Sequence, residues 1–243
     1  MHFFTKEIGD KKSPVVIWGH GWGHSHAAFV PLAESLKNAG RHIVLDFPGF
    51  GATPKPDTDW DVQAYADATA EFIKAQGLKN IIWVGHSFGG RVGIRLAACY
   101  PELVDRMFLI AAAGLKRKRP LWQKLYFGAR VRLFKLLKAM GFNQDKLRAR
   151  FGSRDYNNAG AMRGILIKTI SEDLTEMARK VRCPVTFVYG ENDNETPPEF
   201  GERYAQLIPG AKLVVLEGQD HYSVLGDGRH QVAAMLAEFI EKQ

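Results

Sequence analysis

The residues with the clearest chemical potential are Ser87, Asp193 and His221, each of which lies in a stretch that contains glycine. A serine hydroxyl alone is a poor nucleophile, so a neutral imidazole has to accept its proton. The imidazole in turn needs a carboxylate that fixes its tautomer and stabilises its charged form. A serine, an acid and a histidine in this order along the chain therefore predict attack on an acyl bond by Ser87.

Ser87 lies between two apolar runs of different character. Residues 81–84 predict a buried strand and residues 91–98 predict a helix, so Ser87 falls at the turn between them. Gly85 and Gly89 leave room for a sharp turn, because glycine has no Cβ and tolerates unusual backbone angles. Such a turn would lift the serine hydroxyl to the positive end of the following helix.

The oxyanion that develops during acyl transfer needs backbone N–H donors close to the nucleophile. Phe88 follows Ser87, and Trp22 lies in the glycine-rich loop at residues 19–23, so their N–H groups are the predicted donors. His20, in the same loop, is expected to brace this loop rather than to ionise during catalysis.

The elements that position these residues alternate along the chain. Apolar runs predict strands at 14–18, 42–45, 80–84, 106–110, 184–190 and 212–216, with a weaker edge strand at 2–8. Helical patterns are found at 27–39, 61–76, 91–100, 199–208 and 229–240. This alternation predicts an α/β protein with a mostly parallel sheet of about seven to eight strands, covered on both faces. Function in such sheets gathers at the carboxyl ends of the strands.

The alternation stops at Gly114. Residues 114–182 hold 18 Lys and Arg against 5 Asp and Glu, whereas the net charge of the whole chain is +7. The basic character therefore belongs to one segment, and no nucleic-acid-binding motif accompanies it, so we expect no nucleic-acid partner. We call residues 114–181 the insertion and assign residues 1–113 and 182–243 to the core domain.

The insertion is expected to be mostly helical, and Pro120 can start its first helix. We expect this helix to lie on the core with a solvated basic face. Attraction of an anionic substrate and contact with an anionic membrane surface stay open as alternatives. Aromatic and methionine side chains that could line an acyl pocket, or equally form the core of the insertion, are Trp122, Tyr126, Phe127, Phe134 and Met162.

Other ionisable residues compete for roles at the site. Glu191 and Glu195 lie beside Asp193 and could replace it as the acid. Asp220 precedes His221 and is expected to be a solvated loop carboxylate, because adjacent loop residues seldom point the same way.

A metal site at the histidine cluster formed by His20, His24 and His26 is the less favoured interpretation, since no carboxylate or cysteine joins it in sequence. We expect neither a metal nor a cofactor. Cys99 and Cys183 have no metal-like or redox spacing and are expected to be reduced. No apolar run approaches the ~18 residues of a membrane span, and the first residues lack the pattern of a signal peptide. A cytoplasmic location is the default expectation.

Five motifs in order resemble the α/β-hydrolase fold family over almost the full length: His20-Gly21-Trp22, Asp46-x-Pro48-Gly49-x-Gly51, Gly85-x-Ser87-x-Gly89-Gly90, Gly190-x-x-Asp193-x-x-x-Pro197 and Gly218-x-x-His221. The resemblance implies that Ser87 is the nucleophile, Asp193 the acid and His221 the base. It also implies that the insertion is a cap over the site, and His20 and Tyr222 join the candidate pocket residues. The short N-terminus leaves room for only one strand before residue 14, which favours seven strands.

The resemblance implies a serine hydrolase that acts on an ester or similar small acyl substrate. Hydrolysis of carbon–carbon, thioester or lactone bonds, acyl transfer and peroxidation use the same three residues and stay open. A serine at this turn argues against the dehalogenases and epoxide hydrolases of the family, which use aspartate. A non-catalytic ligand receptor and a lipase that binds membranes through the basic insertion are the rival interpretations.

Overall fold

The structure, a computed structural model, describes residues 2–9, 14–118, 120–142 and 154–241. Its centre is a seven-stranded sheet with the order β1-β3-β2-β4-β5-β6-β7. The strands are β1 Thr5–Ile8, β2 Val15–Gly19, β3 Arg41–Leu45, β4 Ile81–His86, β5 Val104–Ile110, β6 Val185–Gly190 and β7 Lys212–Leu216. Only β1 runs antiparallel to its neighbour, β3. The predicted fold class and the seven-stranded alternative are confirmed.

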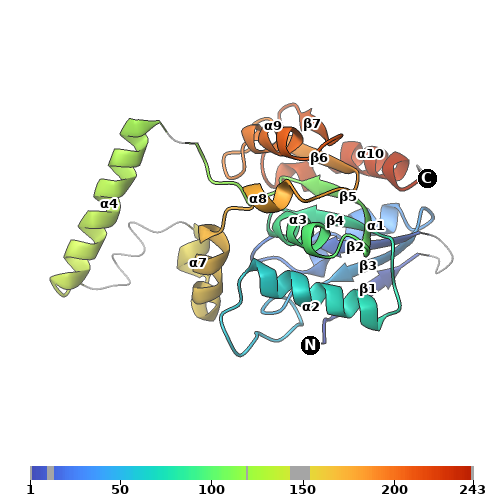
Figure 1. Ribbon diagram of the computed structural model, residues 1–243, viewed down its shortest axis with the longest axis horizontal. Coiled ribbons are helices and arrows are strands. Elements are labelled where there is room, and N and C mark those ends of the chain that lie inside the picture. The colour runs from blue at the N-terminus through green and yellow to red at the C-terminus, as the bar shows by residue number, and fades with distance from the viewer. Residues whose placement is uncertain (1, 10–13, 119, 143–153, 242–243) are drawn as a thin grey trace.

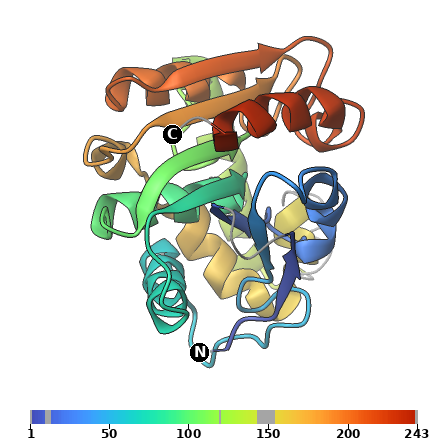
Figure 2. The ribbon, with the colours of Figure 1, turned by 90° about the vertical axis from the view of Figure 1, so that its right-hand side faces the viewer.

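Helices cover both faces of the sheet, as Figures 1 and 2 show. On one face lie α2 (Val62–Ala75), α3 (Phe88–Cys99), α8 (Thr175–Ala178) and α9 (Pro198–Leu207), and on the other lie α1 (Val30–Ser35) and α10 (Arg229–Glu241). Short 3-10 helices occupy His26–Ala28 and Ser223–Leu225. Each face of the sheet therefore has its own apolar layer, which explains why the central strands are apolar throughout rather than alternating.

The first helix is shorter than the sequence pattern predicts. Instead of one helix over 27–39, a 3-10 turn precedes α1, which ends at Ser35. The Ser35 hydroxyl donates to the carbonyl oxygen of Leu32 at 2.7 Å, and the N–H of Leu36 bonds to the carbonyl of Ala33. A serine side chain that competes for backbone carbonyls favours the end of a helix.

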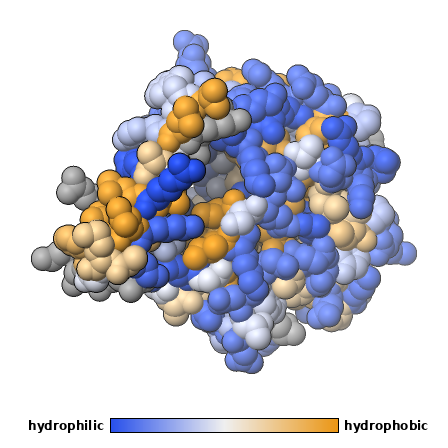
Figure 3. Space-filling view, turned by 60° about the vertical axis from the view of Figure 1, so that its left-hand side comes forward, coloured by the Kyte–Doolittle hydropathy of each residue, from blue (hydrophilic) through white to orange (hydrophobic). Residues whose placement is uncertain are grey.

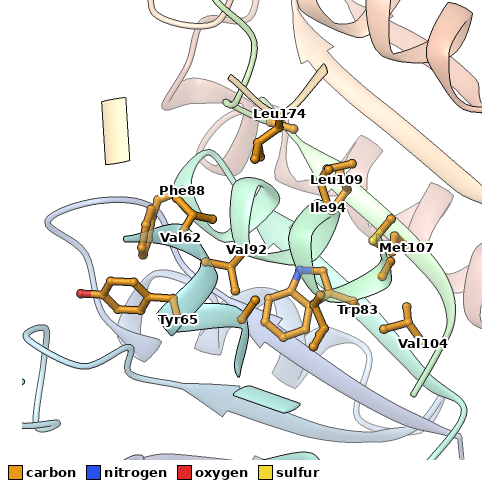
Figure 4. Packing of buried hydrophobic residues seen from close by; sticks show 14 of the residues in the cluster. Val62, Tyr65, Trp83, Phe88, Val92, Ile94, Val104, Met107, Leu109 and Leu174 are labelled. Atoms are coloured by element: carbon orange, nitrogen blue, oxygen red, sulfur yellow. The ribbon is translucent and has the colours of Figure 1, made fainter. Parts of the chain in front are cut away.

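The core beneath α3 also fixes the start of that helix. Figure 4 shows Trp83 and Phe88 among the buried side chains of this layer. The Trp83 indole N–H donates to the carbonyl of Gly89 at 3.0 Å. The rings of Phe88 and Tyr65 meet edge to face, with centroids 5.0 Å apart. Apolar packing and one buried hydrogen bond therefore hold the first turn of α3 against the sheet.

The insertion leaves the core after β5 and returns to it at α8. The N–H of Leu174 donates to the carbonyl of Gly114 at 2.9 Å, so the two ends of the excursion are hydrogen-bonded to each other. Within it lie α4 (Leu121–Ala139), α6 (Arg154–Asn158), a 3-10 turn (Gly160–Met162) and α7 (Arg163–Ser171). Ile165 and Leu166 of α7 are buried, as is Leu174, so the second half of the insertion packs on the core.

The expectation that the first insertion helix lies on the core is wrong. Figure 1 shows α4 standing apart from the sheet and its covering helices. The face seen in Figure 3 carries hydrophobic side chains beside hydrophilic ones, and Leu121 and Leu125 of α4 are 72% and 66% exposed. At 100° per residue, Phe127 and Phe134 fall among the basic residues, so α4 has no single apolar face to present to the core. No described helix has both the length and the apolar character needed to cross a membrane.

Candidate active site

Ser87 lies at the sharp turn between β4 and α3 with φ 49° and ψ −102°. A positive φ is uncommon for a residue other than glycine and marks a strained backbone. A Cβ at Gly89 would collide with the carbonyl of Gly19, and one at Gly85 would lie 2.5 Å from the carbonyl of Gly89. The two glycines thus allow the backbone to approach itself at this point, as the sequence predicts.

His221 and Asp193 approach the turn from the loops after β7 and β6. His221 Nδ1 donates to Asp193 Oδ2 at 2.8 Å, and both residues are buried. The His86 ring lies 5.0 Å from the His221 ring, and His86 Nε2 bonds to the carbonyl of His221 at 3.1 Å. Burial lowers the pKa of His86 to about 3, so His86, the residue before Ser87, is a neutral donor to the backbone of His221.

Among the described residues, the Ser87 hydroxyl forms no hydrogen bond with His221. Catalytic hydrogen bonds are often long before substrate binds and tighten in the reactive complex.

Asp193 is stabilised as a carboxylate although it is buried. Burial opposes ionisation, but hydrogen bonds from His221 and Thr196 outweigh it and hold the pKa of Asp193 below its usual value. Oδ1 accepts from the N–H groups of Glu195 and Thr196, each at 2.8 Å, and Oδ2 lies 2.9 Å from the Thr196 hydroxyl. A charged Asp193 fixes the Nδ1–H tautomer of His221 and leaves Nε2 free to accept a proton.

The other acids hold different positions. Glu191 accepts a hydrogen bond from the N–H of Gly218 at 3.1 Å. Asp220 accepts from the N–H groups of Tyr222 and Ser223, so it organises its own turn. Glu195 comes within 3.6 Å of His221 Nε2, on the side of the ring opposite to Asp193. Asp193 is therefore the acid that meets His221 Nδ1.

The predicted oxyanion donors flank Ser87. Phe88 is the first residue of α3, so its N–H has no acceptor within the helix. The N–H of Trp22 forms no backbone hydrogen bond among the residues that the structure describes. The Trp22 and Phe88 rings meet edge to face at 5.6 Å, which ties the two loops together. This geometry offers two donors to an oxygen near Ser87.

His20 braces the loop that carries Trp22. Its Nδ1 donates to the carbonyl of Gly21 at 2.7 Å, and its Nε2 accepts from the N–H of Phe47 at 3.0 Å. Burial lowers the pKa of His20 to about 4, so the ring is neutral near pH 7 and can serve both bonds.

The neighbouring histidines are held separately. His26 pairs with Asp46 at 2.9 Å, while His24 lies against His86 and Tyr222. Within the described part of the chain, no group of three metal-binding side chains is assembled.

A cavity of about 700 Å³ opens at Ser87, and we call it the main cavity. Its lining combines core loops with the insertion: Trp22, Ser87, Phe88, Arg91, Ala113, Leu115, Lys116, Arg117, Asp155, Leu166, Thr169, Ile170, Asn194, Glu195, Thr196 and Phe200. Three groups of different chemistry therefore meet there: the nucleophile with its donors, apolar side chains and several cations.

The candidate pocket residues named from the sequence are not among those that line the main cavity. Trp122, Tyr126 and Phe127 are exposed on α4, and Phe134 is half-buried on the same helix, which stands away from the main cavity. His20 is fully buried beneath its loop and Met162 packs against Gly49. Tyr222 lines a neighbouring cavity with Trp22 and His24, and its hydroxyl donates to Glu195 at 2.9 Å. The structure thus places none of these residues on the wall beside Ser87.

Thr196 is a site residue that sequence reasoning missed. Its hydroxyl lies 3.0 Å from the carbonyl of Ala111 and 3.1 Å from His221 Nδ1. It therefore links the end of β5 to the acid and the base. The available signal was its place directly before Pro197 in the loop that carries Asp193.

Comparisons with known proteins agree with this geometry. Residues 15–235 match the alpha/beta hydrolase family. A pimeloyl-[acyl-carrier protein] methyl ester esterase of Chromobacterium violaceum is 28% identical over 264 residues and covers 100% of both chains. A 2-(acetamidomethylene)succinate hydrolase of Mesorhizobium japonicum is 28% identical over 237 residues, which cover 90% of this chain and 85% of the relative.

Solved structures show the same fold. An esterase from Exiguobacterium antarcticum superposes with a TM-score of 0.77 at 23% identity and covers 99% of this chain and 96% of its own. An enol-lactonase from Burkholderia xenovorans has a TM-score of 0.76 at 17% identity, covering 99% and 96%. With the family matched over most of the chain, this protein belongs to the alpha/beta hydrolase family.

Proposed function

We propose that the protein is a serine hydrolase that cleaves a carboxylic ester or a related acyl bond through Ser87, His221 and Asp193. The observation that carries the proposal is the buried 2.8 Å pair of His221 and Asp193 beside a serine with positive φ. Of the relatives described above, one is named as a methyl ester esterase and the other as a hydrolase, which supports the same class of reaction.

In the proposed mechanism, His221 Nε2 takes the proton of Ser87 as its oxygen attacks the acyl carbon. The N–H groups of Trp22 and Phe88 stabilise the oxyanion that forms. Protonated His221 then gives its proton to the leaving alcohol, and the acyl-enzyme remains. Water activated by the same imidazole attacks this ester, releasing the acid and the free Ser87. Charged Asp193 stabilises the imidazolium in both half-reactions.

The insertion, residues 114–181, is proposed to act as the cap of a core formed by residues 1–113 and 182–243. Support comes from Leu166, Thr169 and Ile170 of α7, which line the main cavity opposite the core loops. Hydrolysis of carbon–carbon, thioester or lactone bonds and acyl transfer remain alternatives on the same three residues. A non-catalytic ligand receptor is the alternative without turnover.

The test is turnover of p-nitrophenyl esters with acyl chains of increasing length. We expect steady turnover that Ser87→Ala abolishes, and stoichiometric labelling of the wild-type serine by a fluorophosphonate. Ser35→Ala is the matched control, because Ser35 caps α1 away from the site. Turnover that survives Ser87→Ala would refute the nucleophile. Labelling without ester turnover would favour one of the other acyl substrates, and neither labelling nor turnover would favour the receptor.

A second candidate is a lipase that works at an anionic membrane surface, and α4 favours it. The helix exposes Leu121, Trp122 and Leu125 together with Lys135 and Lys138. Apolar and basic side chains on one exposed helix are typical of interfacial binding. We expect binding to phosphatidylserine vesicles at low salt, release at high salt, and loss of binding in Lys135→Glu/Lys138→Glu. No binding at low salt would remove this candidate, with neutral vesicles as the control.

A further inference from the structure

The wall of the main cavity next to the nucleophile carries a buried cation. Arg91 lies four residues after Ser87, one turn along α3, and is 8% exposed. It lines the same cavity as Ser87. Its Nη1 donates to the carbonyl of Glu172 at 3.2 Å. A buried guanidinium is a costly arrangement unless its charge is met by a partner.

The nearby carboxylates are engaged elsewhere. Glu172 pairs with Arg95 rather than with Arg91. Asp173 accepts hydrogen bonds from the N–H of Thr175 at 2.9 Å and from its hydroxyl at 2.6 Å. Within the described ranges, Arg91 forms no ion pair with a carboxylate, although it lies in the field of Asp173. Burial lowers the pKa of Arg91, yet an arginine stays protonated in proteins. The cavity wall therefore holds a positive charge that is only partly compensated by the hydrogen bond to the Glu172 carbonyl.

A second, independent observation comes from the opposite wall. Thr169 of α7 lines the main cavity and is 3% exposed. Its hydroxyl has no hydrogen-bond partner in the part of the chain that the structure describes. A buried hydroxyl without a partner costs free energy that a bound ligand can recover. Arg91 and Thr169 therefore place a buried cation and an unpartnered hydroxyl on the lining of one cavity, on two different elements.

Carboxylates and cations both line the cavity, and Arg117 lies beside Glu195, because its guanidinium donates to the carbonyls of Asn194 and Glu195. Glu195 lies at the catalytic end, where Tyr222 and His221 meet it. Asp155 also lines the neighbouring cavity of Trp22 and His24, on that same side. Cationic Lys116 and Arg117 line the main cavity together with Arg91. The wall from Arg91 to the insertion is thus free to receive an anion between apolar side chains, among them Leu115, Leu166, Ile170 and Phe200.

We propose that the substrate carries a free carboxylate in addition to its scissile acyl bond, and that Arg91 and Thr169 bind this carboxylate. The substrate class is a monoester of a short dicarboxylic acid. One helical turn separates Ser87 from Arg91, about 6 Å along the axis, which suits a few carbon atoms between the two carbonyl groups. A planar guanidinium matches a carboxylate by paired hydrogen bonds, and the threonine hydroxyl adds a third donor. This inference rests on the proposed hydrolase function.

The test compares two esters of equal shape and different charge. One is the monomethyl ester of adipic acid, and the other replaces its free carboxylate by a carboxamide. We expect the wild type to prefer the carboxylate by about 10- to 100-fold in kcat/KM, the range of a charge-assisted hydrogen bond. Arg91→Gln should bring the ratio of the two kcat/KM values to about one, and Thr169→Val should reduce it by about 3- to 10-fold. The isosteric Thr169→Val decides the question if Arg91→Gln does not fold.

Arg95→Gln is the matched control for a purely structural role. Arg95 lies on α3, as Arg91 does, and its substitution removes the ion pair with Glu172. Arg95 is not among the residues that line the main cavity. We expect it to retain the charge preference. Equal activity of the wild type on both esters would overturn the proposal, and so would an Arg91→Gln enzyme that is slower on both with an unchanged ratio. The hydrolase function fails separately, through absence of turnover on every ester together with absence of fluorophosphonate labelling.

Discussion

Two threonines in the main cavity make opposite predictions for the same substitution. The Thr196 hydroxyl lies 3.0 Å from the carbonyl oxygen of Ala111 and 2.9 Å from Asp193 Oδ2 and can donate its one hydrogen to either, whereas the Thr169 hydroxyl has no partner among the described residues. Both side chains are buried, at 5% and 3% exposure. Replacement by valine conserves shape in each case, so the hydroxyl is the only group that changes.

Thr196→Val should destabilise the protein, because the buried acceptor that receives the hydroxyl hydrogen, the Ala111 carbonyl or the Asp193 carboxylate, loses its donor. Leaving such a group unpaired costs about 1–3 kcal/mol. At about 2–4 °C per kcal/mol for a chain of this size, the melting temperature should fall by roughly 2–12 °C. Thr169→Val removes an unpaired hydroxyl and should leave the melting temperature equal or higher.

The assay is thermal unfolding followed by circular dichroism, with urea titration at constant m to confirm that the native state has changed. The two variants differ by position alone, so each is the control for the other. Equal falls in melting temperature for both variants would refute the hydrogen-bond reasoning, as would a Thr169→Val protein that is the less stable of the two.

The remaining predictions concern the turn, the acid and the buried histidine. Gly89→Ala should abolish ester turnover and lower expression of folded protein, because its Cβ collides with the Gly19 carbonyl; a variant with wild-type kcat would contradict this. Asp193→Asn should lower kcat by about 10³–10⁴-fold, since an amide favours the wrong tautomer of His221; a loss below tenfold argues against the assignment. His20 has a folded pKa of about 4, below its unfolded value of about 6.5, so its contribution to stability is complete above pH 6.5 and is lost as pH falls toward 4. The urea midpoint of the wild type should fall between pH 7 and pH 4.5, and that of His20→Gln should fall less. An equal fall of the midpoint in both proteins would contradict the role of His20.

The sequence predicts those features that depend on local chemistry. The strand-turn-helix at Ser87 follows from an apolar run, two glycines and a helical pattern, and the structure shows that turn. The seven-strand sheet follows likewise from the spacing of apolar runs. His20 illustrates a prediction of role, because its buried hydrogen bonds match the brace expected of it.

Features that depend on the partner of a surface are not encoded locally. The sequence of α4 shows that the helix carries apolar residues, but it does not predict which surface they contact. In the structure Leu121 and Trp122 are exposed. The lining of the main cavity cannot be predicted from local sequence either, since Arg91 and Thr169 are 78 positions apart in sequence and line one cavity only in the folded chain. Arg91 still left a signal, as it follows the nucleophile by one helical turn.

The hydrogen bond between Leu174 and Gly114 brings together two residues that are far apart in sequence, where the chain leaves the core and where it returns. Gly114 and Leu174 meet at one point beside the core, so the chain between them forms a closed excursion from the end of β5. Lengthening such an excursion costs little in closure entropy, about 0.6 kcal/mol per doubling. The core can therefore exchange one excursion for another without shifting the register of β5 against β6. Residues of the excursion that line the main cavity, such as Thr169, can therefore change while the strands and the turn at Ser87 stay fixed.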